Sequence, residues 1–104
     1  MAGANPMNLG SLPPLGGDIA TITLSGFSSG SFISHQLHIV YSEMIKGVGL
    51  HEGGPYFSWT DHNKRVALSE EFAKKGGIDP LRNLQDAPVY ITSGSNDHHC
   101  TKEK

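Results

Sequence analysis

The chain has 104 residues, a formal net charge of −2 and 37 % apolar residues. This length predicts one small domain, and the near-neutral charge argues against electrostatic binding of nucleic acid. No stretch approaches the ~18 consecutive apolar residues of a transmembrane helix. The single Cys100 excludes an internal disulfide framework. The first residues lack the basic start and apolar core of a signal peptide, so the compartment is left unknown.

Residues 1–17 contain several glycines and prolines without an apolar period, which predicts an irregular lead-in. Apolar and polar residues then alternate over 19–25, and β-branched residues are frequent there, which predicts a strand. From 29 to 45 the period becomes helical, and Gly47 is expected to stop this helix. Its apolar face consists of Ile33, Leu37, Val40, Tyr41 and Met44, with Ser34, His35, His38 and Ser42 on the other face.

The second half of the chain predicts two more strands and two helical segments. Residues 47–51 and 88–93 have the composition of strands bounded by glycine or proline. Between them, a helix over 64–75 can be capped by Asp61 or Asn63, and Gly76 and Gly77 terminate it.

Asp79 and Pro80 read as the cap and first residue of a short helical turn that runs through Leu84. The order is thus strand, helix, strand, helix, strand, which predicts an α/β fold with a parallel sheet and right-handed crossovers. We expect one domain over 18–99 and a polar tail over 100–104.

The motif Gly26-Phe27-Ser28-Ser29-Gly30 matches G-x-S-x-G and lies between the first strand and the first helix. In this context the motif forms a sharp turn that lifts the serine hydroxyl above the carboxyl edge of the sheet. Both glycines are expected to occupy places without room for a Cβ atom. The following helix offers amides to a developing oxyanion. An ordinary Gly/Ser turn between strand and helix is the alternative.

Several blocks of the sequence resemble the polyhydroxybutyrate depolymerase family of serine esterases. The resemblance spans about Leu12 to Asp97. It is carried by the segments Ile22–Gly30, His35–His38, Gly47–Gly49, Gly53–Tyr56, Gly77–Leu81 and Val89–Asp97. It implies a circularly permuted α/β-hydrolase whose nucleophile lies near the N-terminus. The three recognisable parallel strands and their flanking helices would then form a partial, incomplete α/β-hydrolase-like sheet.

The resemblance also implies residue roles. Ser28 corresponds to the nucleophile, Asp97 to the acid of the triad, and the amide of Ser29 to one donor of the oxyanion hole. The family places its histidine some tens of residues after the aspartate, so the chain is expected to be truncated before the triad histidine.

Histidines within this chain are alternative candidates for the base. His98 and His99 adjoin Asp97, which makes a bridge to Ser28 difficult, and His35 and His38 lie roughly 10–15 Å along the helix. His51, near a strand end, is the best placed in space, although its position differs from the family's.

Glu52 and the histidines invite two further interpretations. Glu52 stands where the family usually has a small or apolar residue, and we expect it to be a solvated strand end. The run from His98 to Cys100 lacks the spacing of a tetrahedral site, so no metal site and no cofactor are predicted.

The sequence therefore predicts a serine ester hydrolase that cleaves poly- or oligo(3-hydroxyalkanoate) esters through an acyl-enzyme on Ser28. The alternative is a non-catalytic hydrolase remnant, or a binding or structural fragment. A thioesterase or peptidase fits the resembling blocks less well. The expected partner is a polyester or small ester substrate, without nucleic acid or membrane. Open sheet edges would also permit self-association and leave the chain marginally stable or oligomeric.

Overall fold

The computed structural model describes residues 10–56 and 60–99 of the chain. In chain order its elements are η1 (Ile19–Thr21), β1 (Ile22–Phe27), α1 (Ser29–Val40), β2 (Ile45–His51), α2 (His62–Lys74), η2 (Leu81–Leu84) and β3 (Val89–Thr92). The described part of the expected lead-in, from residue 10 on, is exposed and without helix or strand until η1. The expected polar tail over 100–104 lies outside the described residues.

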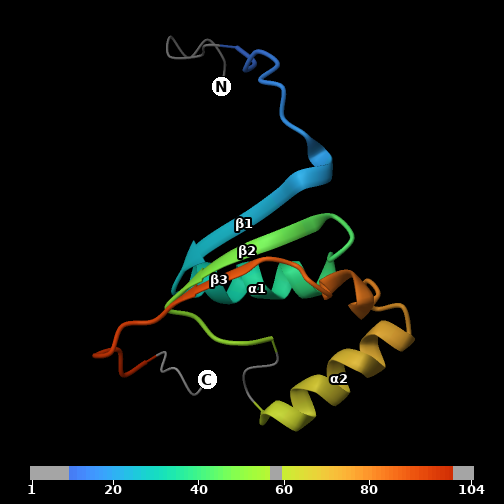
Figure 1. Cartoon of the computed structure of the whole chain (residues 1–104), viewed down its shortest axis with the longest axis vertical. Helices are drawn as coiled ribbons and strands as arrows, with labels where there is room; N and C mark the ends of the chain where they lie inside the picture. Colours follow the sequence, from blue (N-terminus) through green and yellow to red (C-terminus); the bar gives the residue numbers. More distant parts are fainter. Residues whose placement is uncertain (1–9, 57–59, 100–104) are drawn as a thin grey trace.

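The three strands form one parallel sheet in the order β1-β2-β3 (Figure 1). Leu24 lies opposite Val48, and Leu50 lies opposite Ile91. The predicted α/β fold with a parallel sheet and flanking helices is therefore confirmed. Because the strands are parallel, their carboxyl ends meet at one edge of the sheet, where ligands bind in open α/β sheets. Strands β1 and β3 are the two outer strands.

The first strand and the first helix differ from the prediction at their ends. The strand begins at Ile22, because the side chain of Asp18 accepts a hydrogen bond from the Ala20 amide at 2.9 Å and caps a 3-10 turn before it. The helix ends at Val40, and Gly47, the expected stop, lies inside β2. There a Cβ atom would come within 2.9 Å of the Pro88 carbonyl oxygen, so glycine permits the close approach of the chain leading into β3.

Helix α1 packs against β1 and β2 with the opposite face from the one its apolar period predicts. Ser31, Ser34 and His38 are buried, and so is Ser42 just beyond the helix. Four of the five residues of the predicted apolar face are instead exposed, with 59 % of Ile33 and 49 % of Met44 accessible, and Val40 is half-buried. The tight approach of the backbone to β1 and to residues 53–54 favours small side chains on the packed face, which outweighs the apolar period.

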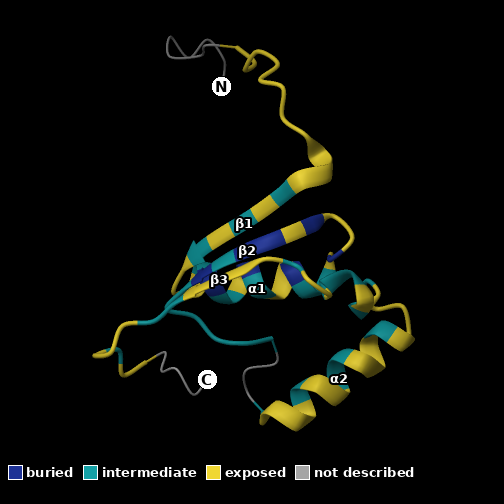
Figure 2. Cartoon of the chain, viewed as in Figure 1, coloured by how far each residue is buried: buried dark blue, intermediate teal, exposed yellow. Residues whose placement is uncertain are grey.

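The apolar core of the described residues is small. Four apolar side chains are buried, Ile45, Val48, Leu50 and Ile78, and Ile22 and Leu24 pack partly against the first three. Figure 2 shows that the buried residues gather in β2 and in the sheet-facing side of α1. The Cα radius of gyration is 17.3 Å, against about 13 Å for a compact domain of 100 residues. The core therefore supports the sheet and α1 more than the rest of the chain.

Helix α2 is set off from the sheet (Figure 1) and has no buried residue. Its N-cap is Asp61, as predicted, whose carboxylate accepts a hydrogen bond from the Lys64 amide at 2.9 Å. Gly76 follows its end at φ 79°, a conformation that glycine adopts readily. Asp79 does not cap η2: Pro80 is the cap residue, and the Asp79 carboxylate accepts from the Glu43 amide at 3.1 Å instead.

Candidate functional site at the carboxyl edge of the sheet

Ser28 occupies the turn between β1 and α1 in a conformation that is rare for a residue with a side chain. Its backbone angles are φ 54° and ψ −116°, and the residue is exposed. The Ser28 amide donates to the His51 carbonyl at 2.9 Å, while the Ser28 carbonyl accepts from Ser31 at 2.9 Å and from Phe32 at 3.1 Å. The turn is thus tied to β2 on one side and to α1 on the other. Conformations of this kind persist where the surrounding structure enforces them, and they cluster at functional sites.

The two glycines of the motif have different roles. A Cβ atom on Gly26 would overlap the carbonyl group of Gly30 and approach the Ser31 amide, so only glycine fits there. A Cβ atom on Gly30 would meet open space. The expectation that neither position has room for a side chain is therefore confirmed at Gly26. It is wrong at Gly30, because no atom lies within 4 Å of the position that a Cβ atom would take there.

Ser29 is the first residue of α1. The first amides of a helix have no acceptor within the helix, and the positive end of the helix dipole lies at the same place. The Ser29 amide follows the Ser28 side chain directly. An oxygen atom held near Ser28 could therefore receive a hydrogen bond from this end of α1.

Glu52 stands at the same edge, directly after β2, and also has a positive φ of 54°. Its amide donates to the Thr92 carbonyl at 3.0 Å, which continues the pairing of β2 with β3. Its Oε1 accepts a hydrogen bond from the Gly94 amide at 2.6 Å. Its Oε2 is shielded from solvent and meets no donor among the described residues. The expectation of a solvated strand end is wrong, because the loop after β3 folds over this carboxyl.

Asp97 lies in that loop, and its carboxyl group is in contact with that of Glu52. Its amide donates to the Gly94 carbonyl at 3.2 Å, and its carboxylate accepts from the His99 amide at 2.8 Å. The side-chain hydrogen bond to Asp97 raises the pKa of Glu52. Desolvation and the negative charge of Asp97 raise it further, while the Gly94 amide and His51 act in the opposite direction. The edge therefore holds two carboxyl groups in contact.

His51 does not reach Ser28 through its imidazole. Its Nδ1 lies 2.7 Å from the Thr92 hydroxyl oxygen, and its ring is tilted against that of Tyr90 with centroids 6.0 Å apart. A Cβ atom on Gly49 would lie 3.4 Å from its Nε2, so the ring extends back over the sheet. For His51 to act as the base for Ser28, its side chain would need a different rotamer.

The other described histidines lie elsewhere. His35 Nδ1 is 3.4 Å from the Gly54 carbonyl oxygen. The pKa of His35 is lowered, and burial is the largest cause. His38 is buried between α1 and the sheet, which lowers its pKa. His98 and His99 are exposed on the loop that carries Asp97. Within residues 10–56 and 60–99, the structure brings no imidazole into hydrogen bonding with Ser28.

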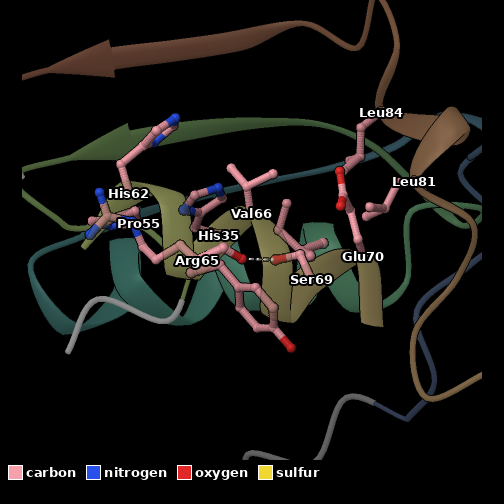
Figure 3. Close-up of a pocket in the computed structure, with 11 residues that line it drawn as sticks. His35, Pro55, His62, Arg65, Val66, Ser69, Glu70, Leu81 and Leu84 are labelled. Atoms are coloured by element: carbon pink, nitrogen blue, oxygen red, sulfur yellow. Dashed lines mark hydrogen bonds between the residues drawn. The ribbon is translucent and has the colours of Figure 1, made fainter. Parts of the chain in front are cut away.

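A separate pocket of about 270 Å³ lies between α1, α2 and η2 (Figure 3). His35 borders it from α1, while Val66 and Arg65 border it from α2. Figure 3 shows the hydrogen bond from the Ser69 hydroxyl to the Arg65 carbonyl, 2.8 Å long, on its wall. The pocket is open and mainly apolar and does not include Ser28, so it is not part of the site at the sheet edge.

In the part of the chain that the structure describes, no group of three or more His, Cys, Asp or Glu residues is placed to hold a metal ion. Cys100, the last member of the run weighed as a metal site, lies outside the described residues. No described helix has the length and apolar character needed to cross a membrane.

The pairing of Glu52 with Asp97 was missed in the sequence, although a signal was present. Each residue follows a predicted strand, and the carboxyl ends of neighbouring parallel strands lie together. Ser28, Glu52 and Asp97 thus follow β1, β2 and β3 in turn. The structure therefore brings the predicted acid to the same edge as the predicted nucleophile, with Glu52 just after the end of β2, the strand between them.

Comparison with known proteins finds a partial similarity. The chain is 35 % identical over 104 residues to a poly(3-hydroxybutyrate) depolymerase from Delftia acidovorans. The match covers 83 % of this chain but only 21 % of the relative, so the chain spans about a fifth of that protein's length. No family model and no solved structure matches. The predicted resemblance is thus confirmed as a similarity between most of this chain and one part of a depolymerase.

Proposed function

We propose that the chain carries the nucleophile and the acid of a serine ester hydrolase. The main observation is the conformation of Ser28, exposed at φ 54° on the turn from β1 into α1. Asp97 supports the proposal, because the next two strands bring its loop to the same edge. The similarity to a poly(3-hydroxybutyrate) depolymerase favours ester hydrolysis over other reactions of such a turn.

In the proposed reaction, Ser28 Oγ attacks the carbonyl carbon of an ester. A C–O bond forms to the serine, and the bond to the alcohol oxygen breaks. An imidazole oriented by Asp97 takes the serine proton and passes it to the leaving alkoxide. Water then cleaves the acyl-enzyme and releases the acid. The Ser29 amide stabilises the oxyanion at the start of α1.

The proposed substrates are poly- or oligo(3-hydroxyalkanoate) esters. Each ester link in such a chain has the carbonyl that Ser28 attacks and a secondary alcohol as the leaving group. An exposed nucleophile at an open sheet edge is accessible to a long chain, whereas a closed pocket would admit only small esters. This assignment comes from the similarity to the depolymerase together with the exposure of Ser28.

The test applies an alkyl fluorophosphonate and a p-nitrophenyl butyrate assay to a full-length version of the protein, in which an imidazole reaches Ser28, and applies the fluorophosphonate also to the purified chain. The reagent forms a bond from phosphorus to the serine oxygen and releases fluoride. We expect one adduct, located on Ser28 by mass spectrometry, and release of p-nitrophenol that Ser28→Ala abolishes. Ser25→Ala is the matched control, because this exposed β1 hydroxyl lies outside the turn. Equal rates for wild type and Ser28→Ala would overturn the nucleophile assignment.

A non-catalytic fragment is the second candidate. It is favoured by one observation, that none of the described imidazoles hydrogen-bonds to Ser28. The same labelling experiment separates the two candidates. Absence of an adduct on Ser28 under conditions that label a known serine esterase would support the fragment.

A further inference from the structure

The contact between Glu52 and Asp97 is not required by the nucleophile turn. Glu52 follows β2, and Asp97 lies in the loop after β3. The Glu52 amide holds the end of β2 to the Thr92 carbonyl at 3.0 Å, so the two strand ends cannot separate easily. The contact therefore joins the two loops that leave neighbouring strands.

The Glu52 side chain anchors the loop at two points. Its Oε1 accepts from the Gly94 amide at 2.6 Å, at the start of the turn. The same turn is closed by the Asp97 amide, which donates to the Gly94 carbonyl at 3.2 Å. The second point is the contact between the Glu52 and Asp97 carboxyl groups. Position and orientation of Asp97 thus both depend on Glu52.

A hydrogen bond at this second point requires a proton. Two ionised carboxylates have only acceptor oxygens and repel each other, so groups in such contact share one proton. Oε2 of Glu52 is shielded from solvent and has no donor among the described residues. A proton on Oε2 lets Glu52 donate to the Asp97 carboxylate. This removes the repulsion between two charged carboxylates and gives the shielded Oε2 a hydrogen-bond partner.

We propose that Glu52 is a positioning residue for Asp97: the two carboxyl groups share one proton, with Glu52 as the donor and Asp97 as the acceptor. This hydrogen bond holds the loop that carries Asp97 at the same edge of the sheet as Ser28. The catalytic meaning of this role rests on the proposed function, in which Asp97 orients the base. The proton-sharing pair itself does not depend on any reaction at Ser28.

The direction of the pH dependence follows from the groups around Glu52. Asp97 from the loop after β3 raises its pKa through the hydrogen bond and the charge, and His51 from β2 lowers it. A carboxyl with a raised pKa in the folded state binds more protons there than in the unfolded state. The bond is fully present below the ordinary value of 4.5 and is lost as pH rises through the raised pKa. Above it, both groups are charged and the hydrogen bond between the two carboxyl groups is lost, while Oε1 of Glu52 still accepts from the Gly94 amide.

The first experiment is a ¹³C NMR titration of Glu52 Cδ, with amide exchange of Gly94 and Asp97 measured over the same pH range. We expect Glu52 to titrate above 4.5 and the Asp97 amide, which closes the turn, to lose protection as it does so, because the two charged carboxylates repel each other. The Gly94 amide stays protected, because an ionised Glu52 is still its acceptor. Glu52→Gln can donate without a titrating proton, so its Asp97 amide stays protected at high pH. Glu52→Ala loses protection of both amides at every pH. Glu43→Gln changes an exposed glutamate away from the loop and should behave as wild type.

Two results would overturn the proposal: Glu52 titrating at or below its ordinary value, or equal Gly94 exchange in wild type and Glu52→Ala. The folded state of each variant is checked by the amide shifts of β2. Fluorophosphonate labelling of Ser28 against pH then tests the catalytic consequence. Labelling that falls at high pH in wild type but not in Glu52→Gln supports it, and parallel profiles refute it. Absence of labelling in every variant refutes the proposed function, while the NMR titration still decides the role of Glu52.

Discussion

The two helices of this protein are stabilised in different ways. Helix α1 has no side-chain hydrogen bond at its N-cap, yet it buries Ser31, Ser34 and His38 against the sheet. Helix α2 buries no residue, but it has a carboxylate cap at Asp61 and an exposed ion pair of 2.7 Å between Glu71 and Lys75. Tertiary packing places the first helix, and local interactions define the second.

The difference explains where the candidate site lies. Ser28 precedes α1, whose close packing on β1 keeps the backbone of the turn in a conformation that a mobile helix would not enforce. Helix α2 contributes no residue to the edge that carries Ser28 and borders only the open pocket of Figure 3. Substitutions should therefore perturb the site through α1 and leave it intact when they affect α2.

Gly26→Ala should have the largest effect on stability. Its Cβ atom would overlap the backbone of Gly30, which cannot move without shifting α1. Overpacking against backbone predicts a loss of about 3 kcal/mol in the free energy of unfolding. The matched control is Gly30→Ala, which meets open space and should stabilise α1 by up to about 1 kcal/mol. Urea denaturation measures both, and equal losses would contradict the asymmetric turn.

Ser34→Leu and Ile33→Ser test which face of α1 is packed. Ser34 is 5 % exposed and Ile33 is 59 % exposed, so the leucine has to enter a filled interface. We expect Ser34→Leu to lower the free energy of unfolding by about 1–3 kcal/mol. Ile33→Ser should change it by no more than about 0.5 kcal/mol, as is usual for surface positions. The reverse order would show that the apolar face is the buried one.

Asp61→Ala should act locally on α2. Loss of the hydrogen bond from the Lys64 amide removes an N-cap worth about 1 kcal/mol. Amide exchange should accelerate in the first turn of α2 and remain unchanged in β2. Asn63→Ala is the control, because the sequence allowed Asn63 as the cap and the structure places it inside the helix. A loss of protection in β2 would show that α2 is coupled to the sheet.

Acidification should lower the free energy of unfolding by weakening the packing of α1 on the sheet. Of the effects predicted here this is the smallest near neutral pH. Burial lowers the pKa of His35 and His38 from 6.5, so the unfolded state binds protons first as pH falls below that value. Stability present above pH 6.5 is therefore lost on acidification. His38→Leu removes a buried imidazole whose Nε2 has no partner among the described residues, and should make the loss shallower. Thermal unfolding between pH 5 and 8 measures it, and identical pH profiles for wild type and variant would contradict this origin.

Much of the fold was predictable because its signals are local. Alternation and β-branched residues identified the first strand, and glycine or proline boundaries identified the other two. Asp61, one of two candidate caps, and Gly76 marked the ends of α2. The prediction was wrong where a local signal competed with packing. Gly47 resembled a helix stop, but it belongs to β2 because a neighbouring chain approaches it closely. The face of α1 was reversed because small polar side chains fit the narrow space against β1.

The sequence by itself determined the element order, the parallel sheet and the position of Ser28 between strand and helix. These follow from period, turn residues and motif, which depend on neighbours along the chain. Only the tertiary structure decided that Glu52 meets Asp97, that His51 meets Thr92 and that α1 packs through serines and a histidine. The first two contacts join residues about 40 positions apart, so they depend on strand register. The packed face of α1 depends on how closely the backbone approaches β1 and residues 53–54. The turn at Ser28 needed both, because the motif permits the conformation and the packing of α1 and β2 enforces it.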